Sequence, residues 1–416
     1  MMGMGDRKME ILEVDARPVV ETLLARALAK RASDLHIEPM AAGYEARLRV
    51  DGLVSVVERF SVEVGKGIVG RLMVMGQLLT YRQDVPQEGR IEWRPPGLAG
   101  EVGPSGKIML RLSIMPTTHG LRAAVRLPAD LLQPRGLTEL GLPAAVLEHL
   151  ERFAHADTGM LLLTGPAGSG KTTTIYALLE HIATVAPGLS IVALEDPVER
   201  DLPGVTQIQV SPFGQLTYER ALKSMLRQDP QVLMLGEIRD AATASLAVLA
   251  ALSGHRLVAT LHAGTPAGAI ARLFEMGIEP YQIAASLYGV MAQRLLRKRN
   301  VAGTLRVPFA RIPEDARSDA TGHGTRSVPA TLGMFGSEQV TGGSGGGEGY
   351  AGRVPIAEFG AMDAAVRAAI LERADLEILT QAFTRQQGYR SLRQMADELV
   401  IMKVTDGAEV RRVLGP

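Results

Sequence analysis

Two hydrophobic periods alternate along the first 130 residues. Residues 17–31, RPVVETLLARALAKR, place apolar side chains at helical spacing, and residues 68–81 are predicted to form another helix. ASDLHIEP at 32–39 and YEARLRVDGLVSVVERF at 44–60 shorten the period towards two, with Asp51-Gly52 as a hairpin turn signal. GRIEW, GKIMLRLSIMPT and GLRAAVRL are expected to be further short strands. Residues 14–130 are therefore predicted to form a smaller, mixed α+β domain.

A different pattern follows PADLLQPRG at 128–136, a turn-rich segment that is predicted to be a linker. GMLLLTG, LSIVALED, QVLMLGE and HRLVATLH are short, almost wholly apolar runs separated by helix-like stretches. Continuous apolar strands alternating with helices are typical of a parallel sheet that is covered on both faces. Residues 137–300 are therefore predicted to form an α/β nucleotide-binding core of P-loop type.

Residues 301–352 break this pattern, because they are rich in Gly, Ser, Thr and Pro and include VTGGSGGGEGYAG. A tract with so little apolar surface to bury is predicted to be a variable, partly flexible insert. Helical periodicity returns after it, so residues 353–416 are predicted to form a C-terminal helical subdomain.

The composition of the 416-residue chain narrows the classes of function. Hydrophobic residues make up 46% and charged residues 22%, as in ordinary soluble globular proteins. The 45 basic residues balance the 45 acidic ones, which disfavours nucleic acid as the main partner. The chain has no cysteine, so disulfides, thiolate metal sites and cysteine nucleophiles are excluded, which fits a reducing compartment.

The N-terminal sequence mixes acidic and basic residues and lacks the apolar segment of a secretory signal. Apolar runs such as SLAVLAALSG are far shorter than the roughly 20 residues that cross a bilayer. We therefore expect a soluble protein with no direct membrane span, whose membrane role comes through a partner.

GPAGSGKT at 165–172 satisfies the complete G-x-x-x-x-G-K-[ST] pattern of a Walker A loop. The apolar run MLLLT precedes it and the helical pattern TTIYALLEHIA follows, which is the context that a phosphate-binding loop requires. Lys171 is expected to reach the β- and γ-phosphates of ATP, and the Thr172 hydroxyl to help hold Mg²⁺. The predicted nucleotide-binding residues are Gly165, Pro166, Ala167, Gly168, Ser169, Gly170, Lys171, Thr172 and Thr173.

Charged residues end the other apolar runs. QVLMLGEIRD carries Gly and Glu237 where such strands usually end in the Asp that holds Mg²⁺, and Glu237 either takes that role or pairs with Arg239. LEDPVER places three carboxylates within five residues, and one of them would orient and deprotonate a water unless this is a solvated acidic turn. His255 and His262 flank one run, and their spacing leaves packing, capping and sensing open.

Taken in order, these segments resemble the secretion ATPase superfamily, in particular the type II secretion E-type and type IV pilus assembly B-type ATPases. The resemblance covers nearly all of residues 17–400. It is carried by ASDLHIEP, RLRVDG, EGRIEW, LSIMPTTHGLRAAVRL, EDPVE, LRQDPQVLMLGEIRD, GHRLVATLHA, ARLFEMGIEPYQIAASLYGVMAQRLLRK and GYAGRVPIAEF.

The resemblance implies a RecA-like P-loop core preceded by a smaller, PAS-like domain. It gives Glu237 the role of the Walker B residue on the Mg²⁺ side, and Glu199 the role of catalytic base in the acidic segment. It also implies that His255 and His262 sense the γ-phosphate.

Three arginines of the N-terminal domain gain a role in the same way. The resemblance implies that Arg111 and Arg126 reach the nucleotide and complete the site when the domains close, and it extends this role to Arg90. The planar guanidinium suits this task because it binds two phosphate oxygens at once.

The chain departs from the family pattern at two places. Typical type II members carry a four-cysteine, zinc-binding insertion after the stretch that matches AQRLLRK, whereas Gly- and Thr-rich sequence stands here, so no zinc is expected. Most members also have an extra N-terminal domain that docks to the membrane platform, but this chain starts almost at the second domain. The usual mode of docking is therefore left open.

The function implied is a cytoplasmic, homohexameric, Mg²⁺-dependent ATPase motor that associates peripherally with the inner membrane. It would act on a platform protein, with a docking protein as a further partner, and feed pilin-like subunits into a type II secretion pseudopilus or a type IV pilus. A pilus retraction motor, a hexameric nucleic-acid translocase and a non-hydrolysing scaffold are the alternatives.

Overall fold

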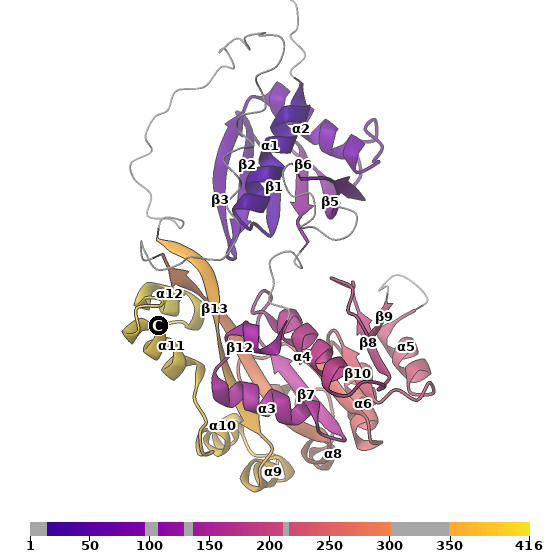
Figure 1. Ribbon diagram of the computed structural model, residues 1–416, viewed down its shortest axis with the longest axis vertical. Helices are drawn as coiled ribbons and strands as arrows, with labels where there is room; N and C mark the ends of the chain where they lie inside the picture. Colours follow the sequence, from indigo (N-terminus) through magenta and orange to yellow (C-terminus); the bar gives the residue numbers. More distant parts are fainter. Residues whose placement is uncertain (1–14, 96–106, 129–135, 211–215, 301–348) are drawn as a thin grey trace, which may run out of the picture. The chain divides into compact units, whose positions relative to one another are not determined.

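The computed structural model describes residues 15–95, 107–128, 136–210, 216–300 and 349–416 (Figure 1). These residues belong to two compact units: the first unit gives way to the second between positions 131 and 132, and residues 350–416 belong to the second unit as well. The predicted linker at 128–136 spans this boundary. Most of that linker lies outside the described residues. The Gly-rich segment 301–348 also lies outside them, and so does the expectation that it holds no zinc.

The first unit is a six-stranded antiparallel sheet with the strand order β3-β2-β1-β6-β5-β4. Two helices pack on one face of it, where Leu24 and Leu72 meet Leu35 and Ile37 in a single core. The elements are α1 (Ala16–Ala29), β1 (Asp34–Met40), β2 (Gly43–Val50), β3 (Leu53–Phe60), α2 (Val62–Met75), β4 (Gln87–Trp93), β5 (Ile108–Thr117) and β6 (Gly120–Arg126).

The second helix differs from its prediction over residues 68–81. It begins at Val62, where the Ser61 hydroxyl accepts the Val64 N–H, and it ends at Met75. Glycines in its first turns hid this start, because glycine disfavours a helix. The structure explains one of them: a Cβ on Gly65 would lie 2.1 Å from the Tyr44 ring, so the helix approaches β2 only with glycine there.

The second unit is built on a seven-stranded, mostly parallel sheet in the order β13-β12-β7-β11-β10-β8-β9, of which only β13 runs antiparallel to its neighbour. The four apolar runs predicted as buried strands are confirmed as β7, β8, β10 and β11. The strand bounds are β7 (Gly159–Thr164), β8 (Ile191–Glu195), β9 (Thr206–Gln209), β10 (Val232–Leu235), β11 (Arg256–Leu261), β12 (Leu287–Arg299) and β13 (Tyr350–Ala361).

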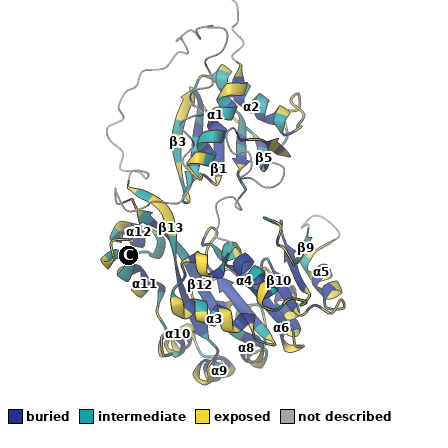
Figure 2. Ribbon diagram, viewed as in Figure 1, coloured by how far each residue is buried: buried dark blue, intermediate teal, exposed yellow. Residues whose placement is uncertain are grey.

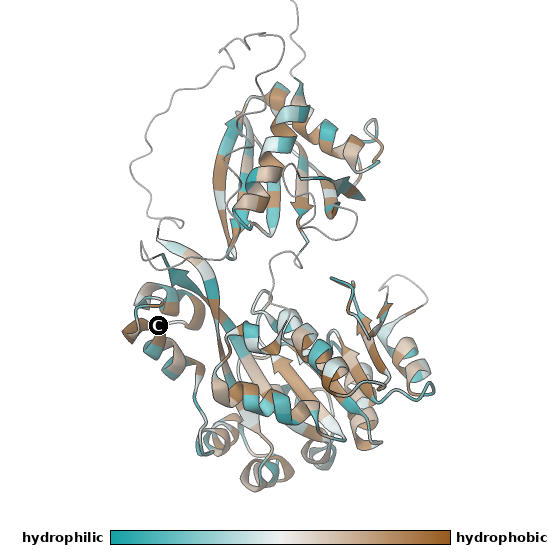
Figure 3. Ribbon diagram, in the orientation of Figure 1, coloured by the Kyte–Doolittle hydropathy of each residue, from teal (hydrophilic) through white to brown (hydrophobic). Residues whose placement is uncertain are grey.

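Helices cover both faces of this sheet, as predicted, and Figure 2 shows the buried strands between them. Strand β7 contributes Met160 and Leu162 to the core on one face, and Leu161 and Leu163 to the core on the other. The same strands stand out as hydrophobic in Figure 3. The covering helices are α3 (Ala144–Ala154), α4 (Lys171–Val185), α5 (Tyr218–Met225), α6 (Ala241–Leu252), α7 (Pro266–Glu275) and α8 (Pro280–Ser286), with a short turn at Leu137–Leu140.

The C-terminal region begins as a strand rather than as a helix. Residues 353–361, predicted to open a helical subdomain, belong to β13, which pairs along most of its length with β12. Four helices then follow: α9 (Ala364–Leu371), α10 (Leu376–Thr384), α11 (Leu392–Ile401) and α12 (Gly407–Leu414).

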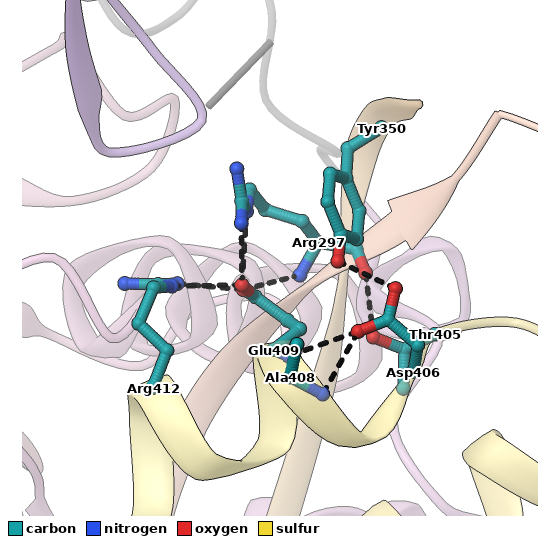
Figure 4. Close-up of polar contacts among 7 residues, drawn as sticks. All are labelled: Arg297, Tyr350, Thr405, Asp406, Ala408, Glu409 and Arg412. Carbon is teal, nitrogen blue, oxygen red and sulfur yellow. Dashed lines mark hydrogen bonds and ion pairs between the residues drawn. The ribbon is translucent and has the colours of Figure 1, made fainter. Parts of the chain in front are cut away.

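A polar cluster around the buried Glu409, the C-terminal clip, consists of Arg297, Tyr350, Asp406, Glu409 and Arg412 and fastens α12 to β12 and β13 (Figure 4). The Glu409 carboxylate accepts hydrogen bonds from Arg297 at 2.8 Å and from Arg412 at 2.6 Å. The Tyr350 hydroxyl donates to Asp406 at 2.5 Å, and the Arg297 guanidinium lies 4.0 Å above the Tyr350 ring. Burial would raise the pKa of Glu409, but the arginine hydrogen bonds outweigh it and lower that pKa to about 2.

Within the described ranges, no helix combines the length and the apolar character that crossing a bilayer requires.

Candidate nucleotide site

The predicted phosphate loop joins β7 to α4 and depends on its glycines. Gly165, Gly168 and Gly170 have φ values of 145°, 75° and 92°, a region that favours glycine. A Cβ on Gly165 would lie 2.6 Å from the carbonyl oxygen of Gln293, and one on Gly170 would lie 2.7 Å from its side-chain nitrogen. The loop therefore rests on β12 on one side, while residues 166–168 are exposed on the other.

The loop fits a polyphosphate. It leads into the N-terminus of α4, whose first N–H groups lack helical acceptors and attract anions. The buried Ser169 hydroxyl finds no hydrogen-bond partner among the described residues. The Lys171 ammonium bonds the carbonyls of Gly165 at 2.7 Å and Pro166 at 3.0 Å, at the mouth of the loop. Burial lowers the pKa of Lys171, which the charge of Glu237 opposes.

Glu237 follows β10 at the same sheet edge, with both carboxylate oxygens engaged. Its Oε1 lies 2.7 Å from Nε2 of His262, and its Oε2 accepts from Nε of Arg239 at 2.8 Å. The preceding glycine has its own reason, since a Cβ on Gly236 would lie 2.7 Å from the hydroxyl of Tyr218. Glycine at this position lets the chain pass close to the Tyr218 hydroxyl directly before Glu237.

Two oxygen groups at this edge fit Mg²⁺. The Thr172 hydroxyl is exposed on the first turn of α4, and the Glu237 carboxylate is half-buried. Mg²⁺ prefers oxygen ligands, and it usually binds one or two protein groups together with substrate phosphates and water. Thr172 and Glu237 are suited to such a shared shell.

The three carboxylates of the acidic segment have separate environments. Glu195 is buried at the end of β8, and both of its oxygens accept hydrogen bonds, one from Tyr176 and one from Gln207 at 2.8 Å. Burial raises the pKa of Glu195. Asp196 lies 3.4 Å from Arg239. Glu199 alone presents an exposed side chain, which supports it over Glu195 as a base for water.

The two predicted histidines lie at opposite ends of β11. Leu261 pairs with Thr164, so His262 follows at the edge of the phosphate loop, whereas Arg256 pairs with Gly159 at the other edge. The six residues of β11 separate the two histidines by roughly 20 Å. His255 instead bonds the Ala250 carbonyl at 2.9 Å and closes α6. The structure does not bring His255 to the nucleotide site, and we remove it from the site.

The predicted arginines form a row on the face of the first unit's sheet opposite its two helices. Arg90 pairs with Arg111, and Arg111 pairs with Arg126, across neighbouring strands. Arg126 in turn pairs with Asp34 on β1. The Asp34 carboxylate lies 3.1 Å from Nε of Arg126 and 3.2 Å from Nε of Arg49. The row belongs to the first unit and the phosphate loop to the second.

Sequence reasoning missed two residues beneath the phosphate loop. Gln293 is buried on β12 and accepts the Thr174 hydroxyl at 2.9 Å. The Arg294 guanidinium donates to the carbonyls of Gln293 at 2.8 Å and Gly264 at 3.1 Å, and burial lowers its pKa. A polar Gln-Arg pair inside the apolar stretch VMAQRLL was the available signal.

The family model described as "Type II/IV secretion system protein" matches residues 13–412. The type IV pilus assembly ATPase PilB of Thermus thermophilus is 37% identical over 93% of this chain, which spans 41% of that relative's length. The type II secretion system protein HxcR of Pseudomonas aeruginosa is 36% identical over 96% of the chain and 78% of its own length.

Solved structures share the fold at lower identity. The ATPase DotB of Legionella pneumophila superposes with a TM-score of 0.66 at 18% identity and covers 95% of each chain. The pilus retraction motor PilT with bound ADP gives a TM-score of 0.60 at 23% identity, over 94% of this chain and 96% of that one.

Proposed function

The chain belongs to the type II/IV secretion system protein family, a family of ATP hydrolases, and we propose that it works as a Mg²⁺-dependent motor. The match confirms the resemblance read from the sequence. One observation carries the proposal: the phosphate loop, Glu237 and His262 converge at the carboxyl edge of β7, β10 and β11. Ligands of open α/β sheets bind at that edge.

The chemistry follows from these residues. The γ-phosphoryl group of ATP passes to water as its bond to the β-phosphate oxygen breaks, and ADP leaves; a bound Mg²⁺ would neutralise charge on the phosphates. The loop N–H groups and Lys171 bind the phosphates, and Thr172 and Glu237 would hold the metal. Glu199 orients the attacking water and takes its proton. His262 holds the Glu237 carboxylate in place through its Nε2, at 2.7 Å from Oε1.

We further propose that the second unit is a RecA-like core and that the first unit is a PAS-like domain. Arg111 and Arg126 reach the nucleotide when the two units close upon ATP. Because ATP then favours a closed arrangement that ADP does not, its differential affinity for the two arrangements supplies conformational work. The predicted domain 14–130 lies in the first unit, and the second unit joins the predicted core 137–300 to residues 350–416.

The partners in this proposal are five further copies of the chain, an inner-membrane platform protein and a docking protein. The motor works at the cytoplasmic side and feeds subunits into a pseudopilus or a type IV pilus. Nucleic acid and zinc have no role in it. The relatives named for type II secretion and type IV pilus assembly support this reading.

Deleting the gene tests the cellular role. Loss of secretion or of the pilus is expected, and complementation with the Lys171→Ala variant should fail. A hyperpiliated strain that no longer retracts its pili would identify a retraction motor instead. ATPase activity that rises steeply with added DNA or RNA and falls with salt would identify a translocase.

A further inference from the structure

Tyr176 connects the helix of the phosphate loop to the acidic segment. It lies on α4, in the second turn after Lys171, and it is buried. Its hydroxyl donates a hydrogen bond to Oε2 of Glu195 and accepts one from the backbone N–H of Glu199 at 3.2 Å. A phenol has a single proton to donate. The hydroxyl proton and one of the oxygen lone pairs of Tyr176 are thus both engaged in hydrogen bonds with the acidic segment.

A second tether lies one turn further along the same helix. Both nitrogens of the Arg200 fork donate to the Glu180 carboxylate, at 2.8 Å and 3.0 Å, and the Arg200 side chain is only 9% exposed. The guanidinium also lies 5.3 Å from the centroid of the Tyr176 ring. Successive residues of the acidic segment, 199 and 200, are therefore fastened to successive turns of α4.

The far side of the acidic segment is fixed as well. The Gln207 amide of β9 donates to Oε1 of Glu195 at 2.8 Å and to the Arg200 carbonyl at 2.9 Å. Its oxygen accepts the Leu202 N–H at 2.8 Å. Residues 195–202 thus form a loop whose backbone is held at several points, while the Glu199 side chain projects outward and is exposed.

We propose that Tyr176 is a positioning residue for the hydrolysis of ATP: its hydroxyl sets the place of Glu199 relative to the phosphates that bind at the start of α4. The inference rests on the proposed role of Glu199 as base. Because the phosphate-binding turn and the Tyr176 hydroxyl belong to one helix, any shift of the bound phosphates carries Glu199 with it. Displacing a catalytic group by about 1 Å lowers a rate by up to about 100-fold.

A structural role alone predicts something different. If Tyr176 only fills the core, Tyr176→Phe removes one oxygen, costs some stability and leaves turnover unchanged. If it positions Glu199, the same substitution lowers kcat while the affinity for Mg·ATP stays within about threefold. The split between kcat and nucleotide affinity therefore separates the two roles.

Tyr350→Phe is the matched control. The Tyr350 hydroxyl also donates to a carboxylate, that of Asp406, and an arginine also lies over its ring, but it belongs to the C-terminal clip (Figure 4). The Tyr350→Phe substitution should lower the melting temperature without changing kcat. Glu180→Gln serves as a second variant of the tether, because it removes the charge that holds Arg200 while leaving the Tyr176 core intact.

The experiment measures kcat, Mg·ATP affinity with a fluorescent nucleotide, and melting temperature for Tyr176→Phe, Glu180→Gln, Tyr350→Phe, Glu199→Gln and the Tyr176→Phe/Glu199→Gln double variant. We expect kcat to fall about 10- to 100-fold in Tyr176→Phe and about 3- to 10-fold in Glu180→Gln. The double variant should be no slower than Glu199→Gln, because Tyr176 acts through Glu199.

The possible failures are distinguishable. Wild-type kcat in Tyr176→Phe, or additive losses in the double variant, would overturn the positioning role and leave the proposed function standing. Should Tyr176→Phe not fold, wild-type kcat in Glu180→Gln overturns it instead. Normal turnover by Glu199→Gln would refute the base assignment itself, and the role of Tyr176 with it.

Discussion

Nε2 of His262 lies 2.7 Å from Oε1 of Glu237, so the contact joins the segment that follows β10 to the residue that follows β11. The other oxygen of Glu237 accepts from Arg239 at 2.8 Å. A cation that binds this carboxylate must therefore compete with, or rearrange, two donors that already use it. The contacts of Glu237 with His262 and Arg239 should therefore change when a metal ion binds.

Glu237→Gln should weaken the dependence on Mg²⁺, because it removes the charge from the proposed metal shell while keeping the side chain's shape. At saturating ATP, we expect the Mg²⁺ concentration for half-maximal activity to rise about tenfold or more. A magnesium titration of ATPase activity measures it. An unchanged Mg²⁺ requirement would show that Glu237 only pairs with His262 and Arg239.

The two histidines should separate in their effects. His262→Ala is expected to lower turnover about 10-fold or more, since it removes a donor beside the proposed γ-phosphate site. His255→Ala is the internal control, because His255 lies at the opposite end of β11 and bonds the Ala250 carbonyl. It should affect the melting temperature and leave kcat unchanged. Equal loss of kcat in both variants would contradict the geometry of β11.

Arg111→Ala and Arg126→Ala should leave ADP affinity nearly unchanged, because neither residue belongs to the unit that contains the phosphate loop. Turnover should fall at least about 10-fold, since a cation facing the γ-phosphate stabilises charge in the transition state. Arg59→Ala is the control: Arg59 is an exposed arginine of the same sheet and pairs with Glu45. If Arg111→Ala and Arg126→Ala retained full activity, the row would not serve the nucleotide.

The C-terminal clip should make the free energy of unfolding depend on pH in the acidic range. The pKa of Glu409 is about 2 in the folded chain, below its ordinary value of 4.5. A lowered folded-state pKa adds stability that is complete above pH 4.5 and is lost as the pH falls towards 2. A shift of this size corresponds to roughly 3 kcal/mol, given that the side chain is buried.

Unfolding in urea at pH 7, 4 and 3 measures this contribution. Glu409→Gln should destabilise the chain at pH 7 and flatten the acid dependence, because the buried Arg297 and the partly exposed Arg412 lose the negative charge that they pair with. Glu275→Gln should change little, since the exposed Arg272–Glu275 pair contributes little. Parallel acid profiles for wild type and Glu409→Gln would rule out Glu409 as the cause.

The central strands were predictable because both of their faces are buried, which leaves almost purely apolar runs. Strand β7 illustrates this, with Met160 and Leu161 in different cores. Strands β12 and β13 were not predictable as a pair, because residues 301–348 separate them in the sequence. The buried polar residues of β12 have distant partners too: Gln293 bonds Thr174 and Arg297 bonds Glu409.

The candidate site likewise has a part that could be predicted from the sequence and a part that could not. The phosphate loop is a local motif, so its spacing alone predicted Lys171 and Thr172. The parallel register of β10 and β11 brings Glu237 to His262, and the packing of α4 beside the acidic segment brings the Tyr176 hydroxyl to the Glu199 N–H, so neither contact follows from a local motif. His255 shows the converse, because two histidines seven positions apart in an extended strand lie at its two ends.

The most direct test of the account is the steady-state release of phosphate from ATP by the purified chain, with and without Mg²⁺, beside Lys171→Ala. We expect Mg²⁺-dependent hydrolysis by the wild type, and a loss of at least about 100-fold in a variant that still folds, because Lys171 is the cation at the phosphate loop. Hydrolysis by Lys171→Ala at the wild-type rate would contradict the assignment of this site.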